Sequence, residues 1–387
     1  MPKMQLVLIL STISLLGVTS GCGSSGTAPS TLTSKPEFLF VMALQPPSNA
    51  ELLAFSLDPA TETLTPSSTT GAPLTFGIAA DSTSKSVYIS NGDLLAPAID
   101  IFSIDQMTGS LTASGAFNLA SSWPGGLATD SKGKFLYYSS DTIGSTLPQG
   151  IGALSVDTAT GALTPVPGSP FPATDFPYAV LVHPSGHFIY TENTSVPPTF
   201  PLSLKSISGF SVASATGALA PVPNSPFAPP MTADLTGFKF HPGGEFLYAS
   251  TGSAVNGILG WSVDSTTGTL SRLSASPFAS GTTVVGITID PTGKFLYSFN
   301  GGQLSGFNID AGSGTLTAMS GSPFETGGAI GSLVIDPSGQ ILVAGDLKNQ
   351  TIILLKINAL TGALIPLGSP TPISGGPVSM VMATAPQ

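Results

Sequence analysis

The stretch DPTGKFLYSFNGGQLSGFNIDAGSGTLTAMSGSPF, residues 290–324, contains one complete copy of a pattern that recurs along the chain. It begins with an Asp-x-x-Gly turn, continues into an apolar run that ends at Tyr297, and alternates between apolar and polar residues from Leu304 to Ile309. A tight Ser313-Gly314 turn and a short run at Thr315–Met319 complete the copy. Short alternating runs bounded by Gly, Pro, Asn or Ser predict β-strands.

Two markers define the period of this repeat. The turn D/H-x-x-G recurs with the first positions Asp130, His183, His241, Asp290 and Asp336, and without its glycine at Asp81. The second marker, T-G-x-L with degenerate copies, has leucines about 50 residues apart, at Leu64, Leu111, Leu163, Leu219, Leu270, Leu316 and Leu364. Each copy has room for four strands, which we name A to D in chain order. Seven copies therefore predict an all-β fold, a seven-bladed β-propeller of four-stranded antiparallel blades.

The two ends of the predicted propeller, residues 36–387, complement each other. Residues 38–41 read as a B strand with no A strand before them, whereas residues 377–383 match an A strand such as residues 177–182. We therefore expect the C-terminal strand to complete the first blade, whose other strands come from residues 38–66. Such a closure removes an exposed sheet edge.

Residues 1–21 have the features of a signal peptide. Lys3 precedes a thirteen-residue apolar run, Leu6–Val18, which is too short to span a bilayer as a helix. The following Thr19-Ser20-Gly21-Cys22 resembles a bacterial lipoprotein cleavage box, and this resemblance implies that Cys22 is lipid-modified and begins the mature chain. The alternative is a chance cysteine beside an ordinary cleavage site. Residues 22–35 are rich in Gly, Ser and Thr and predict a flexible tether with a reach of roughly 20 Å.

These features predict an exported, lipid-anchored protein of the cell envelope, periplasmic or on the outer membrane. Cys22 is the only cysteine, so an intramolecular disulfide is impossible. The whole chain carries a net charge of −10, and loss of Lys3 leaves 10 basic and 21 acidic residues, or −11. Because the sequence offers no basic patch, we expect no nucleic-acid partner and contact with a membrane only through Cys22. We expect a monomer.

In a propeller the A–B and C–D turns share one face, which we call the turn face. The B–C and D–A loops share the other, which we call the funnel face. His183 and His241 occupy the Asp position of an A–B turn and His187 lies in the same hairpin, so all three predict structural roles. No Cys cluster or HExxH motif is present. We expect no metal and no cofactor.

The funnel face supplies the candidate site. Small polar residues follow the aromatic position of the B strand by three, at Asn91, Ser140, Asn193, Thr251, Asn300 and Asp346. Acids nearby are Asp93, Asp141, Asp175, Glu192 and Asp234, and Lys348 is the notable base. Trp123 and Phe176 are predicted in D–A loops, where they could stack on a ligand. These residues predict either a ligand-binding funnel or a set of strand caps that solvate the rim.

The motifs D-P-S-G-x-F-L-Y, I-D-x-x-T-G-x-L and G-S-P-F over residues 36–387 resemble the lactonase-type seven-bladed propellers. That family includes the propeller form of 6-phosphogluconolactonase. Its enzymes carry a His at the start of an A strand and an Asp-Arg pair in a B–C loop. The positions that match the His are Phe76, Gly125, Tyr178, Thr236, Val285 and Gly331, and Gln350 and Thr351 replace the Asp-Arg pair. A phosphate group would need cationic partners, and this face offers little beyond Lys348. If the chain hydrolyses a lactone as the resemblance implies, we therefore expect a lactone that is not phosphorylated.

Three functions follow from these features. The first is a non-catalytic lipoprotein that binds a carbohydrate, a peptide or a partner protein through its funnel face. The second is a hydrolase of a neutral or weakly charged lactone, with Glu192, Asp141 or Asp346 as the general base for water. The third is a structural cell-surface protein without a small ligand.

Overall fold

A computed structural model describes residues 37–45, 49–73, 77–93, 95–119, 123–141, 149–173, 176–194, 204–228, 235–251, 257–279 and 284–384. Within these ranges the regular secondary structure is β-strand. No helix in them is long and apolar enough to cross a bilayer. The predicted signal peptide, tether and Cys22 lie outside the described residues.

The stretch that opens the sequence analysis forms the blade hairpin it predicts. Asp290 lies at the A–B turn, where its carboxylate accepts the backbone N–H of Phe295 (2.6 Å) and of Thr292 (3.0 Å). Gly293 closes this turn with a φ of +73°, a left-handed conformation that strains residues with a Cβ. The B strand that follows is buried, and it pairs antiparallel with the strands on both sides.

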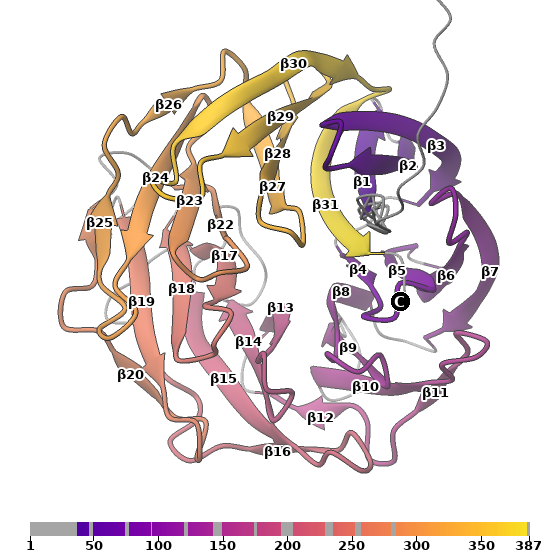
Figure 1. Cartoon of the computed structure of the whole chain (residues 1–387). Helices are drawn as coiled ribbons and strands as arrows, with labels where there is room; N and C mark the ends of the chain where they lie inside the picture. Colours follow the sequence, from indigo (N-terminus) through magenta and orange to yellow (C-terminus); the bar gives the residue numbers. More distant parts are fainter. Residues whose placement is uncertain are drawn as a thin grey trace, which may run out of the picture. The chain divides into compact units, whose positions relative to one another are not determined.

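Seven antiparallel sheets form the blades, and Figure 1 shows them arranged around a central axis. Blade 1 consists of β31 (Gly376–Thr384), β1 (Glu37–Gln45), β2 (Asn49–Asp58) and β3 (Thr63–Ala72). Blade 2 consists of β4 (Ile78–Ala80), β5 (Ser86–Asn91), β6 (Ala98–Ile104) and β7 (Leu111–Asn118). Blade 3 consists of β8 (Trp123–Thr129), β9 (Phe135–Asp141), β10 (Gly150–Val156), β11 (Leu163–Pro165) and β12 (Phe171–Pro172).

The other four blades repeat this order from the axis outward. Blade 4 consists of β13 (Phe176–Val182), β14 (Phe188–Thr194), β15 (Leu204–Val212) and β16 (Leu219–Pro221). Blade 5 consists of β17 (Leu235–Phe240), β18 (Phe246–Thr251), β19 (Gly257–Val263), β20 (Leu270–Arg272) and β21 (Phe278–Ala279). Blade 6 consists of β22 (Gly286–Ile289), β23 (Phe295–Phe299), β24 (Gln303–Ile309), β25 (Leu316–Ala318) and β26 (Phe324–Glu325). Blade 7 consists of β27 (Ile330–Ile335), β28 (Ile341–Asp346), β29 (Thr351–Ile357) and β30 (Leu364–Pro372).

The outer strand of blades 3, 5 and 6 is split into two pieces that both pair with strand C. The break falls at the repeated Ser-Pro-Phe, whose Ser–Pro bond is cis in four copies. The serine hydroxyl accepts a backbone N–H of strand C, as in Ser322 with Gly306 (3.0 Å). The phenylalanine of the motif is buried at Phe278 and half-buried at Phe324. The motif therefore fastens the outer strand to its own blade.

The predicted closure of the ring is confirmed. Strand β31 pairs antiparallel with β1, from Glu37 opposite Thr384 to Leu44 opposite Gly376. The C-terminal strand thus supplies the innermost strand of blade 1, and no edge of β1 is left open.

Tyrosines of three B strands fasten their blades to the next one. The buried hydroxyl of Tyr190 donates to the carbonyl of Gly268 in the following blade (2.6 Å), and Tyr248 and Tyr297 do the same with Gly314 and Gly362 (both 2.7 Å). These glycines belong to the T-G-x-L turns and have positive φ. At these three interfaces the tyrosine that follows one marker therefore contacts the turn of the other marker in the next blade.

Candidate functional site

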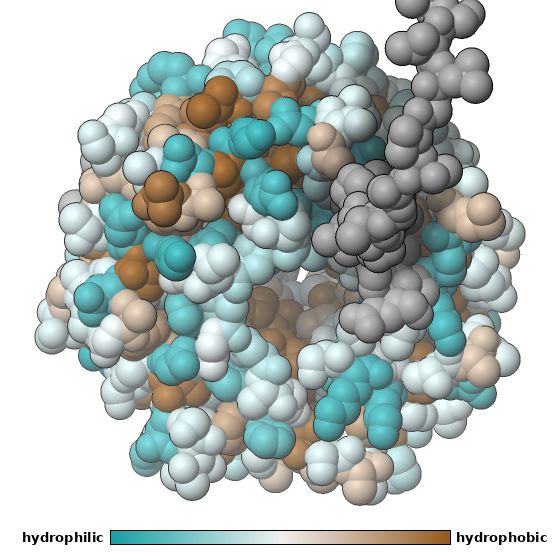
Figure 2. Space-filling view, viewed as in Figure 1, coloured by the Kyte–Doolittle hydropathy of each residue, from teal (hydrophilic) through white to brown (hydrophobic). Residues whose placement is uncertain are grey.

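The innermost strands of the seven blades, β31, β4, β8, β13, β17, β22 and β27, surround the axis. Figure 2 shows a hollow at this centre with largely apolar walls. Lys239 on β17 is the one charged residue among these seven strands. Its side chain is exposed, yet the blades around it limit its contact with bulk water, and this desolvation lowers the pKa of its ammonium group.

The predicted small polar residues lie at the B–C ends of the B strands. Asn91, Thr251 and Asp346 are the last residues of their strands, Ser140 and Asn193 are next to last, and Asn300 directly follows β23. The register expected from the repeat is therefore correct for all six residues. Whether they bind a ligand depends on how their polar atoms are occupied.

Three of the six are strand caps. Thr251 donates to the carbonyl of Gly257 across the B–C loop (2.7 Å), and Asn300 accepts the N–H of Gln303 (3.1 Å). Asn91 donates to Asp100 on the neighbouring strand (3.2 Å) and accepts the N–H of Asp93 (3.0 Å). These contacts favour the strand-cap interpretation at these three positions.

Asp346 is held still more tightly. One carboxylate oxygen accepts the N–H groups of Ala329 (3.0 Å), Lys348 (2.9 Å) and Asn349 (3.1 Å), and the other accepts the Asn349 side chain (2.6 Å). Burial alone would raise the pKa of Asp346, but these donors outweigh it and lower the pKa. Asp346 is therefore an ionised group whose lone pairs are occupied by the loops it organises.

Asn193 and Ser140 keep an unsatisfied polar atom. The Asn193 amide donates to Ser206 (2.9 Å) and Ser208 (2.7 Å) on β15. Its Oδ1 and the Oγ of Ser140 are buried without a hydrogen-bond partner among the described residues. Buried polar atoms are nearly always paired in folded proteins, so these two atoms are the candidates at this face to pair with a ligand or a water molecule.

Glu192 differs from the other acids of this face whose side chains the structure describes. Its side chain is 2% exposed, and no hydrogen bond joins its carboxyl group to another described residue. Because burial disfavours the charged form, the pKa of Glu192 is raised to about 8. Tyr178 lies beside it in a bulge of the innermost strand β13, and burial and then the charge of Glu192 raise the pKa of the Tyr178 hydroxyl. Glu192 is thus a mostly protonated acid one strand behind the axis.

The remaining predicted residues are spread over the funnel face. Trp123 begins β8 and is half-buried, Phe176 begins β13 and is buried, and Asp93 and Lys348 are exposed in B–C loops. Asp93 accepts the N–H of Leu95 (2.9 Å). The candidates Asp175 and Asp234 lie outside the described residues, as does the side chain of Asp141, so their predictions stay untested.

The family model described as Lactonase, 7-bladed beta-propeller matches residues 237–382, which run from β17 to β31. A candidate 6-phosphogluconolactonase from Bacteroides fragilis is 19% identical, with a TM-score of 0.73 over 92% of this chain and 99% of its own. The chain is a lactonase-like seven-bladed β-propeller.

Two further solved structures extend the comparison. A candidate 6-phosphogluconolactonase from Bacteroides uniformis shares 18% identity with the lactonase-like propeller (TM-score 0.72, covering 90% of this chain and 99% of that chain). A periplasmic gluconolactonase from Pseudomonas aeruginosa shares 14% identity (TM-score 0.71, covering 91% and 100%). At these identities the likeness shows the fold. A comparison with curated protein sequences gave no match.

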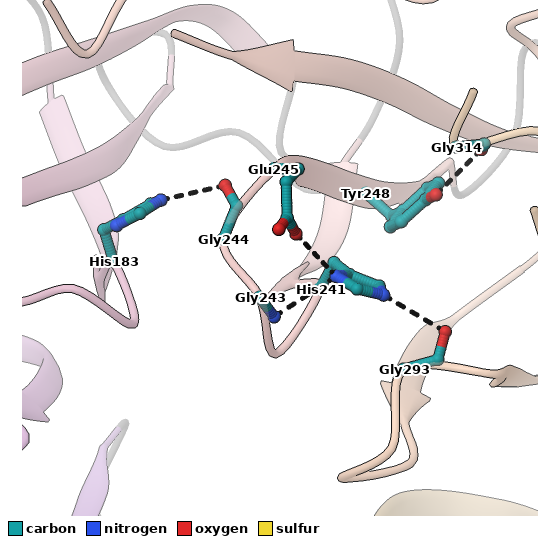
Figure 3. A network of polar contacts seen from close by, with 8 residues as sticks. All are labelled: His183, His241, Gly243, Gly244, Glu245, Tyr248, Gly293 and Gly314. Carbon is teal, nitrogen blue, oxygen red and sulfur yellow. Dashed lines mark hydrogen bonds and ion pairs between the residues drawn. The ribbon is translucent and has the colours of Figure 1, made fainter. Parts of the chain in front are cut away.

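The histidines of the lactonase-like propeller serve the turn face, as Figure 3 shows. His183 contacts the carbonyl of Gly244 (2.8 Å) and His241 that of Gly293 (3.1 Å), each in the A–B turn of the next blade. His241 also pairs with Glu245 at 3.0 Å. Desolvation is the main cause of the lowered pKa of His183. Both rings stand where other blades have a turn aspartate.

Sequence reasoning missed two residues of the lactonase-like propeller, Tyr178 and Lys239. Tyr178 was noted only as a position where the family has a histidine, yet the bulge in β13 brings it beside Glu192. Lys239 stands between Phe238 and Phe240. A charged residue inside an otherwise apolar A strand was the signal available for it. No group of three or more His, Cys, Asp or Glu side chains that could hold a metal ion occurs within the described ranges.

Proposed function

We propose that this lactonase-like propeller is an exported hydrolase of a sugar lactone that is not phosphorylated. The observation that carries the proposal is Glu192, a buried carboxyl group with no hydrogen-bond partner among the described residues and a pKa raised to about 8. A general acid or base works best when its pKa lies near the pH of the reaction. Asp346 cannot take this role without giving up the hydrogen bonds by which its carboxylate holds the neighbouring loops.

The chemistry needs one group that accepts and returns a proton. In its ionised form Glu192 accepts a proton from a water molecule as the water oxygen attacks the lactone carbonyl carbon. The ring C–O bond then breaks, and the leaving alkoxide takes the proton from Glu192. The product is the hydroxy acid, and Glu192 returns to its ionised, carboxylate form. Tyr178, beside Glu192 and 40% exposed on the innermost strand, is placed to hold the water or the substrate.

The charge of the face supports an uncharged substrate. The described parts of the B–C and D–A loops contain one basic residue, Lys348. A phosphate group is usually held by several cationic side chains, whereas the described parts of these loops supply one. The periplasmic gluconolactonase of similar fold supports both a plain sugar lactone and export.

Hydrolysis of gluconolactone by the purified protein, followed as acid release, tests this proposal. We expect the wild-type rate to rise with pH through about 8, as Glu192 ionises. Glu192→Gln should lower the rate at least about a hundredfold and abolish this rise. Asp346→Asn is the comparison variant and should keep the pH profile. A Glu192→Gln protein with the full rate and pH profile would overturn the role of Glu192.

A binding module for a carbohydrate, a peptide or a partner protein is the second candidate. The buried, unsatisfied atoms of Ser140 and Asn193 favour it, because they could pair with ligand hydroxyl or amide groups without any reaction. Calorimetry with a panel of oligosaccharides tests it. Saturable binding by a protein without lactonase activity, weakened by Asn193→Ala, would favour the binding module over the hydrolase.

The lipid anchor at Cys22 belongs to the same proposal. Cys22→Ser should release the protein from the membrane fraction of the cells that export it, and the mature wild type should carry the mass of attached acyl chains. Unchanged fractionation and mass would refute the anchor. The expected monomer is tested by light scattering in detergent, which a dimer mass would contradict.

A further inference from the structure

The turn face carries a crevice between blades 3 and 4 that three basic side chains line. Lys132 and Lys134 come from the A–B turn of blade 3, and His187 comes from that of blade 4. Asp130 also lines the crevice. The protein as a whole has a net charge of −10, so this grouping runs against its overall charge.

The carboxylate in this crevice, that of Asp130, already accepts hydrogen bonds from its own turn. The Asp130 carboxylate accepts the backbone N–H of Lys134 (2.6 Å), Phe135 (2.8 Å) and Lys132 (3.3 Å), as the turn motif requires. Neither lysine forms an ion pair or a side-chain hydrogen bond with another residue that the structure describes. The two ammonium groups are therefore available to a ligand.

The corresponding crevice between blades 2 and 3 provides an internal comparison. There Lys85 is the basic residue, and its ammonium donates to the carbonyl of Thr158 (3.0 Å) in the C–D turn of blade 3. The same turn contributes Asp157 to the crevice wall. The ammonium of Lys85 is thus paired with a carbonyl, and the carboxylate of Asp157 in the same wall would repel an anion.

The crevice between blades 3 and 4 lacks that acid. Its wall includes Ser214 of the C–D turn of blade 4, and Ala213 stands in this turn at the position of Asp157. The other C–D turns all carry a polar side chain at this position, namely Asp58, Asp105, Asp157, Asp264, Asp310 and Asn358. The one alanine of the series thus falls beside the crevice that three basic side chains line, and its lack of a carboxylate removes a charge that would repel an anion.

We propose that this crevice binds the phosphate or sulfate group of a small soluble ligand. Lys132 and Lys134 supply charge-assisted hydrogen bonds from one blade, and the His187 ring supplies a donor from the next. Three basic side chains around one crevice can hold one oxyanion, but they do not form the extended basic surface that a polyanion needs. The proposal is therefore compatible with the expectation of no nucleic-acid partner. The site is on the turn face and is independent of the proposed hydrolase.

Calorimetric titration of the full chain with sodium sulfate, inorganic phosphate and glucose 6-phosphate tests the proposal at low ionic strength, where exposed charges are least screened. Calorimetry is preferred to a melting shift because sulfate and phosphate stabilise proteins without binding a site. We expect saturable binding at one site per chain. Tighter binding of glucose 6-phosphate than of phosphate would identify a sugar phosphate as the ligand class, and equal binding would identify the free anion.

The decisive variant is Ala213→Asp, because the other turns show that the fold accepts an acid at this position. In Asp157 the carboxylate accepts two N–H groups of its own turn, at 2.9 Å and 3.0 Å, so Ala213→Asp should not impair folding. We expect it to weaken binding about tenfold or more, as should Lys132→Gln combined with Lys134→Gln. Lys85→Gln is the matched control and should leave binding unchanged. No saturable heat in the wild type, or equal binding by Ala213→Asp, would overturn the proposal.

Discussion

The two ends of a B strand differ in how completely their polar groups are satisfied. At the turn face the carboxylate of Asp290 accepts two backbone N–H groups, and His241 reaches into the same turn from the preceding blade. At the funnel face Glu192 is equally buried, yet its carboxyl group has no hydrogen-bond partner within the described ranges. One end uses its polar residues to hold the fold, whereas the other keeps some of them unsatisfied.

This difference shows where a repeat protein can carry function. Because the blades repeat, each residue can be compared with the residues at the same position of the other blades. A residue that differs from these and makes no contact that explains the difference is not needed for the fold. Glu192 is such a residue, because the matching positions two places after the B-strand aromatic include Ser90, Ser139 and Ser250. Ala213 and Lys132 on the turn face are others. The following predictions test the comparison, starting with the largest effect.

Gly293→Val should lower the free energy of unfolding by about 4 kcal/mol. Gly293 has a φ of +73°, and a Cβ there would lie 2.2 Å from Nε2 of His241, so strain and a clash add up. Gly301 is the matched control at the funnel end of the same strand, with a φ of +83° and open space around it. Gly301→Val should cost only the strain, about 1–2 kcal/mol. Equal losses in urea unfolding would show that the turn face is no more tightly packed than the funnel face.

Asp290→Ala should lower the free energy of unfolding by about 3 kcal/mol, because it leaves the buried N–H of Phe295 and the part-buried N–H of Thr292 without an acceptor. The exposed C–D turn residue Asp310 also accepts backbone N–H groups, at 2.8 Å and 3.2 Å. There water replaces the lost acceptor, so Asp310→Ala should have a clearly smaller effect. Thermal unfolding of both variants measures the contrast, and a larger loss for Asp310→Ala would refute it.

Glu192 should make the protein less stable as the pH rises. Its pKa is raised from the ordinary 4.5 to about 8 in the folded state, so the folded protein holds a proton that the unfolded chain releases. The stabilisation is complete below the unfolded pKa and is lost as the pH rises through the folded pKa. Relative to Glu192→Gln, wild type should lose about 2 kcal/mol between about pH 6 and about pH 8. Glu37 at the ring closure also has a pKa raised to about 8, by burial and by Asp336, so only the difference between the two proteins isolates Glu192.

Tyr190→Phe should cost about 1–2 kcal/mol, because it removes the donor to the Gly268 carbonyl in the next blade. Tyr88 is the matched control, since within the described residues no hydrogen bond joins its buried hydroxyl to the next blade. Tyr88→Phe should leave the stability unchanged or raise it. If Tyr88→Phe destabilises the protein as much as Tyr190→Phe, the inter-blade hydrogen bond is not the reason that the tyrosine recurs.

The sequence predicts the fold well because the repeat is local. Asp290, Gly293 and Tyr297 lie within one hairpin, and each appears in the sequence beside the neighbours that explain it. The candidate site is harder to predict, because the burial and the hydrogen bonds of its residues depend on segments that are distant in the sequence. Asp346 and Glu192 look alike as acids near strand ends, yet a donor from Ala329, across the blade, saturates the first, and nothing equivalent reaches the second. The bulge that places Tyr178 beside Glu192 also has no short-range signal.

The pairing of β1 with β31 has a topological consequence. Because Glu37 and Thr384 are opposite each other in one antiparallel pair, a short linker could join these positions without moving any blade. The joined chain could then be opened at an exposed loop such as residues 347–350, between β28 and β29. The resulting permutant would latch its ring in blade 7 instead of blade 1. Blade 1 is thus first only in chain order, and any blade of this ring can serve as its seam.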